Sequence, residues 1–393
     1  MKILAIETSC DETAVSILDA EGDIEEPRLK SLSDVVLSQT EIHREYGGVF
    51  PALAKREHTK NLIPLLKEAM SQAGISSEKK IISEDLEDKF SELFSHEQGM
   101  AQEITEFLNH HNSPNIDAIA VTYGPGLEPA LWVGINTAKA LSLAWNRPLV
   151  PVNHIEGHFA SVLFNKAQNK QNKPPELPAL ALVISGGHTE LIKIKEWGDL
   201  EYLGGTVDDA VGEAFDKAAR MLGLPYPGGP PLSKLAEKSR LAGKENPFYL
   251  PRPMKSSGDL NFSFSGLKTA VLYTIKKEKD INEENKAFMA RAFEDAVAEV
   301  LVNKTEKALK EAGYRSLIVC GGVSANSYIR ENFNQFGKKI GIPVLIPELS
   351  LSTDNACMIA IASFLVFETR EEDVLKDEKD IIELKADGNA RIG

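Results

Sequence analysis

Short runs of apolar residues, separated by polar turns, begin the chain. The run KILAIET (2–8) is followed by the polar turn SCDET and by a second apolar run, AVSILD (14–19). Two apolar runs of strand length joined by Ser, Thr and Asp residues predict a β-hairpin. The segment PALALVISGGHTELIKI (178–194) has the same plan, with Ser-Gly-Gly-His-Thr as its turn. It predicts a second hairpin.

Two further segments combine an apolar run, a glycine turn and a longer helical pattern. They are IDAIAVTYGPGLEPALWVGINTAKALSLAW (116–145) and RSLIVCGGVSANSYIREN (315–332). Each half of the chain therefore begins with a hairpin and ends with a strand, a glycine turn and a helix. This order predicts an internally duplicated α/β fold, with two lobes and a central cleft for a ligand.

Two segments interrupt the duplicated pattern. Residues 76–115 are charged and polar, but apolar residues recur in them at roughly helical spacing: Leu86, Phe90, Leu93, Phe94, Met100, Ile104 and Leu108. This spacing predicts a surface insertion that contains one amphipathic helix. The segment NKAQNKQNKPPELP (165–178) is polar and ends in prolines, which suits a boundary between the two halves.

Composition narrows the class of protein. Hydrophobic residues make up 42% of the 393 residues, as in ordinary globular proteins, and no stretch approaches the ~20 apolar residues that span a membrane. The first residues, MKILAIETSC, form no cleavable signal pattern. Cys10, Cys320 and Cys357 are too few and too scattered for a disulfide framework or a zinc ribbon. We therefore expect a cytoplasmic protein.

The net charge of −14 argues at first sight against a nucleic-acid partner. The acidic excess is concentrated, however, with a net charge of −6 in residues 77–107 and −5 in residues 368–387. Lysines and arginines gather at 54–60, 165–173 and 250–257. These clusters leave a local basic face open, although solvated loop charges are the simpler explanation of each one.

Three glycine turns are candidate ligand-binding segments: VISGGHT (183–189), YPGGPPL (226–232) and CGGVSAN (320–326). Glycine lets a backbone turn sharply and approach a ligand closely. Successive backbone N–H groups hold anionic oxygens, and so does the N-terminus of a helix. A tight hairpin turn or a capped helix explains each segment taken alone. Three such turns in one duplicated frame favour an anionic or nucleotide ligand.

The stretch PVNHIEGHFASVLF (151–164) places His154 and His158 four residues apart, where one face of a helix can offer both to a metal ion. The zinc-protease motif needs a glutamate directly after the first histidine. Ile155 occupies that position, and Glu156 lies about 200° around the helix. The protease interpretation therefore lacks its general base, and two ordinary polar histidines remain an alternative.

A third candidate ligand, Asp354, lies in the segment SLSTDNACMIA (350–360). Two histidines and one carboxylate suit a catalytic iron or zinc centre. Spacing alone does not pair residues that are so distant in the sequence.

Seven motifs occur in this order: AIETSCDETAVSIL, NHIEGH, ALVISGGHTELI, GEAFDKAARMLGLPYPGGP, FSFSGLKTA, CGGVSANSYIR and STDNACMIA. Together they resemble the bacterial branch of the tRNA N(6)-adenosine threonylcarbamoyltransferase family, TsaD, over nearly the whole chain. The resemblance implies the actin/hexokinase/Hsp70-type (ASKHA) fold. We divide the chain into an N-terminal lobe, 1–155, with the acidic insertion, and a C-terminal lobe, 156–393, with the substrate loops and Asp354.

The resemblance also implies roles for individual residues. His154, His158 and Asp354 match the family's metal ligands, which bind one divalent ion, usually Fe²⁺, with zinc as the alternative. The implied substrate-binding residues are Val183, Ile184, Ser185, Gly186, Gly187, Asp216, Gly229 and Asn326. Asp11 lies where kinases of this fold keep a catalytic or metal-linked aspartate. No residue is an obvious general base, so the catalytic residue stays unassigned.

The implied reaction transfers the threonylcarbamoyl group from L-threonylcarbamoyladenylate to the N6 amine of an adenosine and releases AMP. That adenosine lies 3′ of the anticodon in tRNAs that read codons beginning with A. The implied partners are a TsaB-like paralogue and a TsaE-like ATPase. The acidic insertion and the pair Glu128–Pro129 depart from the family pattern.

Two other classes of protein remain as alternatives. A small-molecule kinase of the same fold would turn over ATP, but it would not explain the two histidines with Asp354. A non-catalytic scaffold paralogue would lack the histidine pair and the later glycine motifs, and this chain has both.

Overall fold

Both predicted hairpins are present in the computed structural model. It describes residues 1–75, 81–97, 99–111, 114–278, 282–310 and 313–392. Strand β1 (Lys2–Glu7) pairs antiparallel with β2 (Glu12–Glu21). Strand β8 (Ala179–Ile184) pairs in the same way with β9 (Thr189–Glu196).

Each hairpin belongs to a five-stranded sheet, and the two sheets have equivalent strand orders. These orders are β3-β2-β1-β4-β5 and β10-β9-β8-β11-β12. In each sheet the first two pairs of neighbouring strands are antiparallel, and the last two pairs are parallel. The remaining strands are β3 (Arg28–Ser38), β4 (Ala118–Gly124), β5 (Leu149–Asn153), β6 (Phe164–Asn165), β7 (Lys170–Gln171), β10 (Asp199–Gly205), β11 (Ser316–Cys320) and β12 (Val344–Leu345). This repeated topology confirms the predicted duplicated α/β fold.

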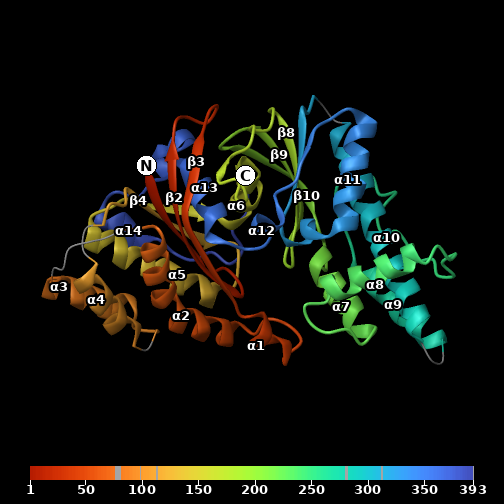
Figure 1. Ribbon diagram of the computed structural model, residues 1–393, viewed down its shortest axis with the longest axis horizontal. Coiled ribbons are helices and arrows are strands. Elements are labelled where there is room, and N and C mark those ends of the chain that lie inside the picture. Colours follow the sequence, from red (N-terminus) through yellow and green to blue (C-terminus); the bar gives the residue numbers. More distant parts are fainter. Residues whose placement is uncertain (76–80, 98, 112–113, 279–281, 311–312, 393) are drawn as a thin grey trace. The chain divides into compact units, whose positions relative to one another are not determined.

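Helices connect the strands of both sheets (Figure 1). Up to residue 163 they are α1 (Thr40–Arg44), α2 (Pro51–Gln72), α3 (Glu84–Leu93), α4 (Met100–His110), α5 (Glu128–Trp145), α6 (His154–Ala160) and the 3₁₀ turn η1 (Ser161–Leu163). The later ones are α7 (Val211–Met221), α8 (Gly229–Leu241), α9 (Ser265–Lys277), α10 (Glu283–Leu309), η2 (Gly322–Ala325), α11 (Ser327–Ile340), α12 (Leu349–Ser352), α13 (Ala356–Thr369), η3 (Glu371–Asp373) and α14 (Glu378–Glu383). No described helix is both long enough and apolar enough to cross a membrane.

The chain forms two compact units. The first comprises Met1–His43, Val49–Pro174 and Asp354–Ile392, and the second comprises Arg44–Gly48 and Pro175–Thr353. The end of the first stretch at Pro174 falls in the loop 165–178, whereas a division after residue 155 falls inside α6. Because the chain returns with α13, Asp354 is part of the first unit.

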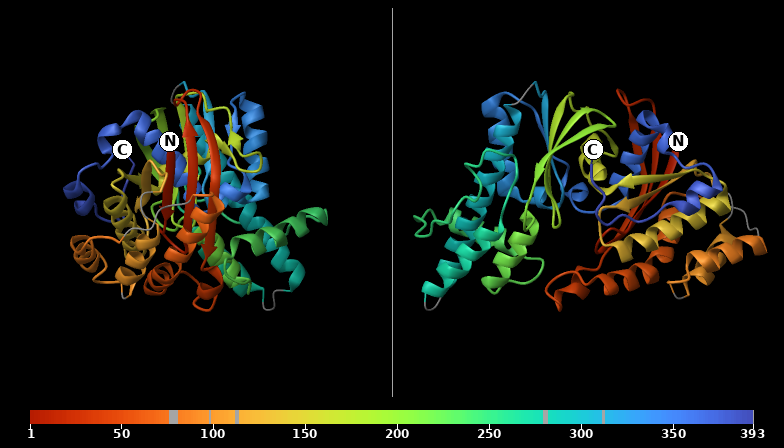
Figure 2. Two further views of the ribbon diagram at one scale, coloured as in Figure 1. Left: turned by 60° about the vertical axis from the view of Figure 1, so that its left-hand side comes forward. Right: turned by 180° about the vertical axis from the view of Figure 1, so that it is seen from behind.

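Helix α13 explains this return to the first unit. Its sequence, ACMIAIASFLVFET, is buried from Ala356 to Val366. A helix that is apolar on all sides has to be covered on all sides. It packs against β1, β2 and β5 and against α6, while α2 and α5 cover the other face of the first sheet, where Leu4 and Ile6 point (Figures 1 and 2). In the second unit, α8 packs along the long helix α10.

Helix α5 begins at the Glu128–Pro129 pair. Pro129 lies in its first turn, where a missing backbone N–H costs no helical hydrogen bond. The helix ends at Asn146, which adopts the left-handed conformation with φ of 51°, a common helix C-terminus. The departure from the family pattern at this point is therefore compatible with a normal helix start.

The acidic insertion forms two helices, α3 and α4, and not the single helix predicted. Residues 76–80, 98 and 112–113 of this segment lie outside the described residues. Its large apolar side chains belong to the hydrophobic core of the first unit: Phe90, Phe94, Met100, Ile104, Phe107 and Leu108. The expectation of a purely superficial insertion is therefore wrong, because both helices pack on α5 and α4 also packs on α2.

A buried polar network joins α2 to the turn after β1. His58 is fully buried, and its Nδ1 lies 2.7 Å from Thr13 Oγ1, while its Nε2 lies 3.0 Å from the carbonyl oxygen of Cys10. Gln39 approaches the same Nδ1 atom at 3.3 Å. Burial lowers the pKa of His58 to about 4, so the folded protein holds this imidazole neutral.

We expect His58 to make the first unit sensitive to acid. The unfolded chain takes up a proton near pH 6.5, and the folded chain does so only near pH 4, so stability is full above pH 6.5 and falls as the pH drops to 4. The difference is worth about 3 kcal/mol. Urea unfolding at pH 7, 5.5 and 4 should show this loss, and His58→Gln should show a flatter dependence over that range. If the free energy of unfolding depended equally on pH in both proteins, His58 would not be the source of the acid sensitivity.

Candidate functional site

The two histidines of the NHIEGH motif meet Asp354 in the first unit. Both lie on α6, whose N-terminus is capped by the Asn153 side chain, which accepts a hydrogen bond from the Ile155 N–H. The Nε2 atoms of His154 and His158 lie 3.5 and 3.3 Å from Asp354 Oδ1. One candidate ligand atom from each of the three residues falls within 4.8 Å of the others. The tertiary structure thus brings Asp354 to the two histidines, which their spacing in the sequence does not predict.

Glu7 holds His154 from the opposite side. Its Oε2 lies 3.0 Å from His154 Nδ1 and accepts a hydrogen bond from Thr122 Oγ1 at 2.6 Å. Its Oε1 accepts from the Ser9 N–H, and Ser9 Oγ lies 3.2 Å from His154 Nδ1. A carboxylate on one ring nitrogen directs the other toward a metal. Sequence reasoning missed Glu7, although a glutamate at the end of an otherwise apolar strand was an available signal.

Negative charge surrounds the two imidazoles. Burial disfavours the charged form of His154, but the carboxylates of Asp354 and Glu7 raise its pKa to about 9. Burial, together with the charges of Asp11 and Asp354, raises the pKa of Glu12 well above its usual value. A bound cation would offset the repulsion among these carboxylates.

His158 is the residue most suited to a metal. It is fully buried, burial lowers its pKa, its Nδ1 has no hydrogen-bond partner among the described residues, and its Nε2 lies 3.3 Å from Asp354 Oδ1. Buried polar atoms are normally satisfied, and a neutral imidazole is the form that binds a metal. The donor set of His154, His158 and Asp354 therefore fits a divalent ion.

Glu156 takes no part in this cluster. Its carboxylate forms an ion pair with Arg370, with Arg370 Nη2 at 2.5 Å from Oε2. The glutamate of the NHIEGH motif is therefore used to hold α6 to the end of α13, as expected from its position on the helix.

In the second unit, the turn between β8 and β9 lies against the start of α7. Ser185 N–H donates to the His188 carbonyl at 2.8 Å, and Gly212 N–H donates to the Ser185 carbonyl at 3.1 Å. Val183 and Ile184 are buried in β8, whereas Gly186 and Gly187 are exposed. A Cβ on either exposed glycine would meet no described atom within 4 Å, so packing does not require glycine there. Their bare backbone is accessible to a ligand.

Helix α7 also carries Asp216, which fixes the Pro-Gly-Gly turn. Its Oδ1 accepts a hydrogen bond from the Gly228 N–H at 2.6 Å. Gly229 is the first residue of α8. The structure therefore brings Asp216 and Gly229 together, and α7 links both to the turn at Ser185.

Asn326 is held by three side-chain contacts. Its Oδ1 caps α11 by accepting from the Ile329 N–H at 2.9 Å. Its Nδ2 donates to Glu294 Oε1 at 2.7 Å and to Ser233 Oγ at 3.2 Å. Glu294 is fully buried and paired with Arg240. The Asn326 amide is therefore fixed in orientation, and sequence reasoning identified neither Glu294 nor Arg240.

Each of the three basic clusters has internal ion pairs. Lys55 pairs with Glu97 at 2.7 Å, and Lys166 pairs with Asp34 at 2.5 Å. In the third cluster Arg252 and Lys255 share Glu299. These pairs reduce the positive charge that each cluster presents.

Comparison with known proteins identifies the family. The family model described as "TsaD: tRNA N6-adenosine threonylcarbamoyltransferase" matches residues 30–81 and 94–361. A protein of that name from Persephonella marina is 42% identical over all of this chain and 95% of its own length. Another from Thermosipho africanus is 45% identical over 93% of this chain and 94% of its own. Full-length HypF shares the fold, with a TM-score of 0.52 at 11% identity over 94% of this chain and 46% of HypF. The chain therefore belongs to the tRNA N6-adenosine threonylcarbamoyltransferase family and is an enzyme of this kind.

Proposed function

We propose that the donor in this reaction is L-threonylcarbamoyladenylate and that AMP is released. The acceptor is the N6 amine of the adenosine 3′ of the anticodon in tRNAs that read codons beginning with A. The observation that carries this proposal is the buried cluster of His154, His158 and Asp354, supported by Glu7. A small-molecule kinase of this fold has no use for such a cluster, and a non-catalytic scaffold would not need it.

The second unit supplies the proposed donor site. An open backbone turn lies beside the N-terminus of α7. The proposed donor contacts in and before this turn are Val183, Ile184, Ser185, Gly186 and Gly187. Backbone N–H groups in such a turn suit the phosphate of an adenylate. Asp216 and Gly229 border this region, and the fixed amide of Asn326 is the further proposed contact, for which Glu294 and Arg240 act as positioning residues.

The first unit supplies the proposed metal site. His154, His158 and Asp354 would hold one divalent ion, Fe²⁺ or Zn²⁺, and Glu7 would orient His154. A metal bound there would supply Lewis-acid chemistry. The adenine amine is a weak nucleophile, so the protein must contribute chiefly by holding donor and acceptor in place.

We further propose that the enzyme works in the cytoplasm with a TsaB-like paralogue and a TsaE-like ATPase. The internal pairing of the three basic clusters supports a tRNA surface that is contributed in large part by these partners. ATP hydrolysis then belongs to the ATPase and not to this chain.

The direct test is nucleoside analysis of a tRNA transcript after incubation with the chain, L-threonylcarbamoyladenylate and the two partner proteins. We expect threonylcarbamoyladenosine and an equal amount of AMP. A transcript with guanosine in place of the target adenosine is the control and should stay unmodified. ATP turnover by this chain alone, with no modified nucleoside in the complete mixture, would contradict the proposal and favour a kinase.

Gly212→Ala should weaken donor binding through the backbone turn. An added Cβ would lie 2.7 Å from the Ser185 carbonyl oxygen and 2.8 Å from Gly186 Cα, so the turn would have to move. Small displacements of this kind cost about 10–100-fold in activity. We expect this cost to appear as a higher KM for the donor. Glu213→Ala, on the exposed side of the same helix, should leave KM unchanged. An unaltered KM in a folded Gly212→Ala protein would remove the turn from the donor site.

A further inference from the structure

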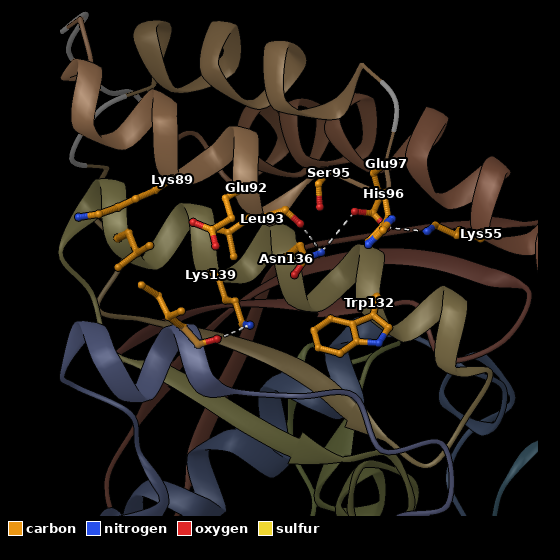
Figure 3. Close-up of a pocket in the computed structure, with 12 residues that line it drawn as sticks. Lys55, Lys89, Glu92, Leu93, Ser95, His96, Glu97, Trp132, Asn136 and Lys139 are labelled. Carbon is orange, nitrogen blue, oxygen red and sulfur yellow. Dashed lines mark hydrogen bonds and ion pairs between the residues drawn. The ribbon is translucent and has the colours of Figure 1, made fainter.

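A cavity of about 380 Å³ lies in the first unit, between the insertion helix α3, helix α5 and helix α14 (Figure 3). Its size is within the range of ligand pockets, which is about 300–1,000 Å³. Trp132 and Leu143 of α5, Leu93 of α3 and Ile382 give it an apolar lining. The histidine–carboxylate cluster contributes no residue to it.

Three lysines and two glutamates line the same cavity, so its charged side chains sum to one positive charge in an acidic protein. Two of the lysines already have carboxylate partners. Lys55 pairs with the buried Glu97 at 2.7 Å, and Lys89 pairs with Asp85 and Glu378 at 2.8 Å each. The third lysine is Lys139 of α5.

Lys139 is an unusual lysine. It is only 2% exposed, and its Nζ donates to the Ile382 carbonyl at 2.8 Å and lies 5.4 Å from the centre of the Trp132 ring. Among the described residues it forms no ion pair with a carboxylate. Burial lowers its pKa to about 8. An ammonium has three donors, so a buried one with a single carbonyl partner retains donor capacity.

We propose that this cavity binds a small organic carboxylate with a flat apolar body. The carboxylate pairs with Lys139 Nζ, and the apolar body lies against Trp132 and Leu143. A carboxylate would give Lys139 a charged partner, whereas a phosphate would bring excess negative charge beside Glu92 and Glu97. Glu97 is fixed by Lys55 and by Asn136, whose Nδ2 lies 3.4 Å from Glu97 Oε2, so that end of the cavity is closed to a second anion.

Helix α5 connects this cavity to the candidate metal centre. The Ala130 carbonyl accepts a hydrogen bond from Thr8 Oγ1 at 3.0 Å, and Gly134 packs against the same side chain. Thr8 lies between Glu7 and Ser9, which both contact His154. A ligand held by Lys139 therefore binds the same helix that supports the histidine cluster.

Calorimetric titration with 3-phenylpropionate and its neutral amide, 3-phenylpropionamide, tests the proposal. The two probes share the flat apolar body and differ in charge. A charge-assisted hydrogen bond discriminates by at least ~10-fold, so we expect the acid to bind the unmodified protein that much more tightly than the amide. Lys139→Met should remove this preference, and Trp132→Leu should weaken both probes.

Lys89→Met is the matched control, because Lys89 lies at the same cavity but is already paired. It should leave the preference for the acid intact. Thermal unfolding of each variant establishes that it is folded. Equal binding of acid and amide by the unmodified protein would overturn the proposal without any variant, and so would the absence of binding up to about 10 mM. An unchanged acid affinity in folded Lys139→Met protein would overturn it as well.

Discussion

Asp354→Ala is expected to lose its bound metal and at least ~100-fold of its transfer activity, because loss of residues that merely support a metal ligand already costs 10–100-fold. Asp354 Oδ1 is the atom that both histidine Nε2 atoms approach, at 3.5 and 3.3 Å. Without it the site keeps only two ligands on one helical turn. Metal content per chain, measured on the purified protein, should fall together with the amount of threonylcarbamoyladenosine formed per unit time.

Two variants make this experiment specific. Glu7→Gln keeps an oxygen beside His154 but removes the charge that holds it, so it should retain part of the metal and of the activity. Glu156→Gln lies on the same helix but pairs with Arg370, so it should retain full metal content. Full metal occupancy in Asp354→Ala protein would exclude the three-ligand site, whatever happens to activity.

Phe107→Ala is expected to destabilise the first unit by about 3–5 kcal/mol, the usual cost of removing a buried phenyl ring. Phe107 is 1% exposed. Its ring stacks on His111 with centroids 4.4 Å apart and lies 6.3 Å from the ring of Trp145. The surrounding helices cannot close the space, because α4 is fixed by further buried residues such as Ile104 and Leu108. Urea unfolding of the two proteins at pH 7 gives the difference.

Gln102→Ala is the control for this measurement. Gln102 is exposed on the same helix, and such substitutions change stability by less than about 0.5 kcal/mol. If α4 were an accessory surface, as the acidic composition suggested, Phe107→Ala would cost as little as Gln102→Ala. That outcome would place the insertion outside the core.

The helices of the acidic insertion were predicted only in part from the sequence. The apolar residues at helical spacing indicated a helix, whereas the charged composition indicated a surface insertion. The segment holds two helices, because α3 ends at Leu93 and α4 begins at Met100, directly after Gly99 in the left-handed conformation. Both helices pack on α5, and the spacing of apolar residues does not contain this contact between distant segments.

The two hairpins, the strand–glycine–helix units and the duplication were all predictable from the sequence, because each depends on residues that are close together in the chain. The alternation of apolar runs and polar turns determines the strands, and the repetition of that plan determines the matching sheet orders. The His154–His158 pair was predictable for the same reason, since four residues of helix separate the two rings.

Contacts between distant segments were decided only by the tertiary structure. Glu7, at the end of β1, contacts His154 across 147 positions, and Gly212, at the start of α7, lies against the turn at Ser185. Asp354 joins the first unit because the apolar helix α13 that follows it must be buried against β1 and β2. Resemblance to a family could suggest Asp354 as a ligand, but no local sequence pattern predicts contacts between residues that are so distant in the chain. Their energies come from burying surfaces that meet only after the chain has folded.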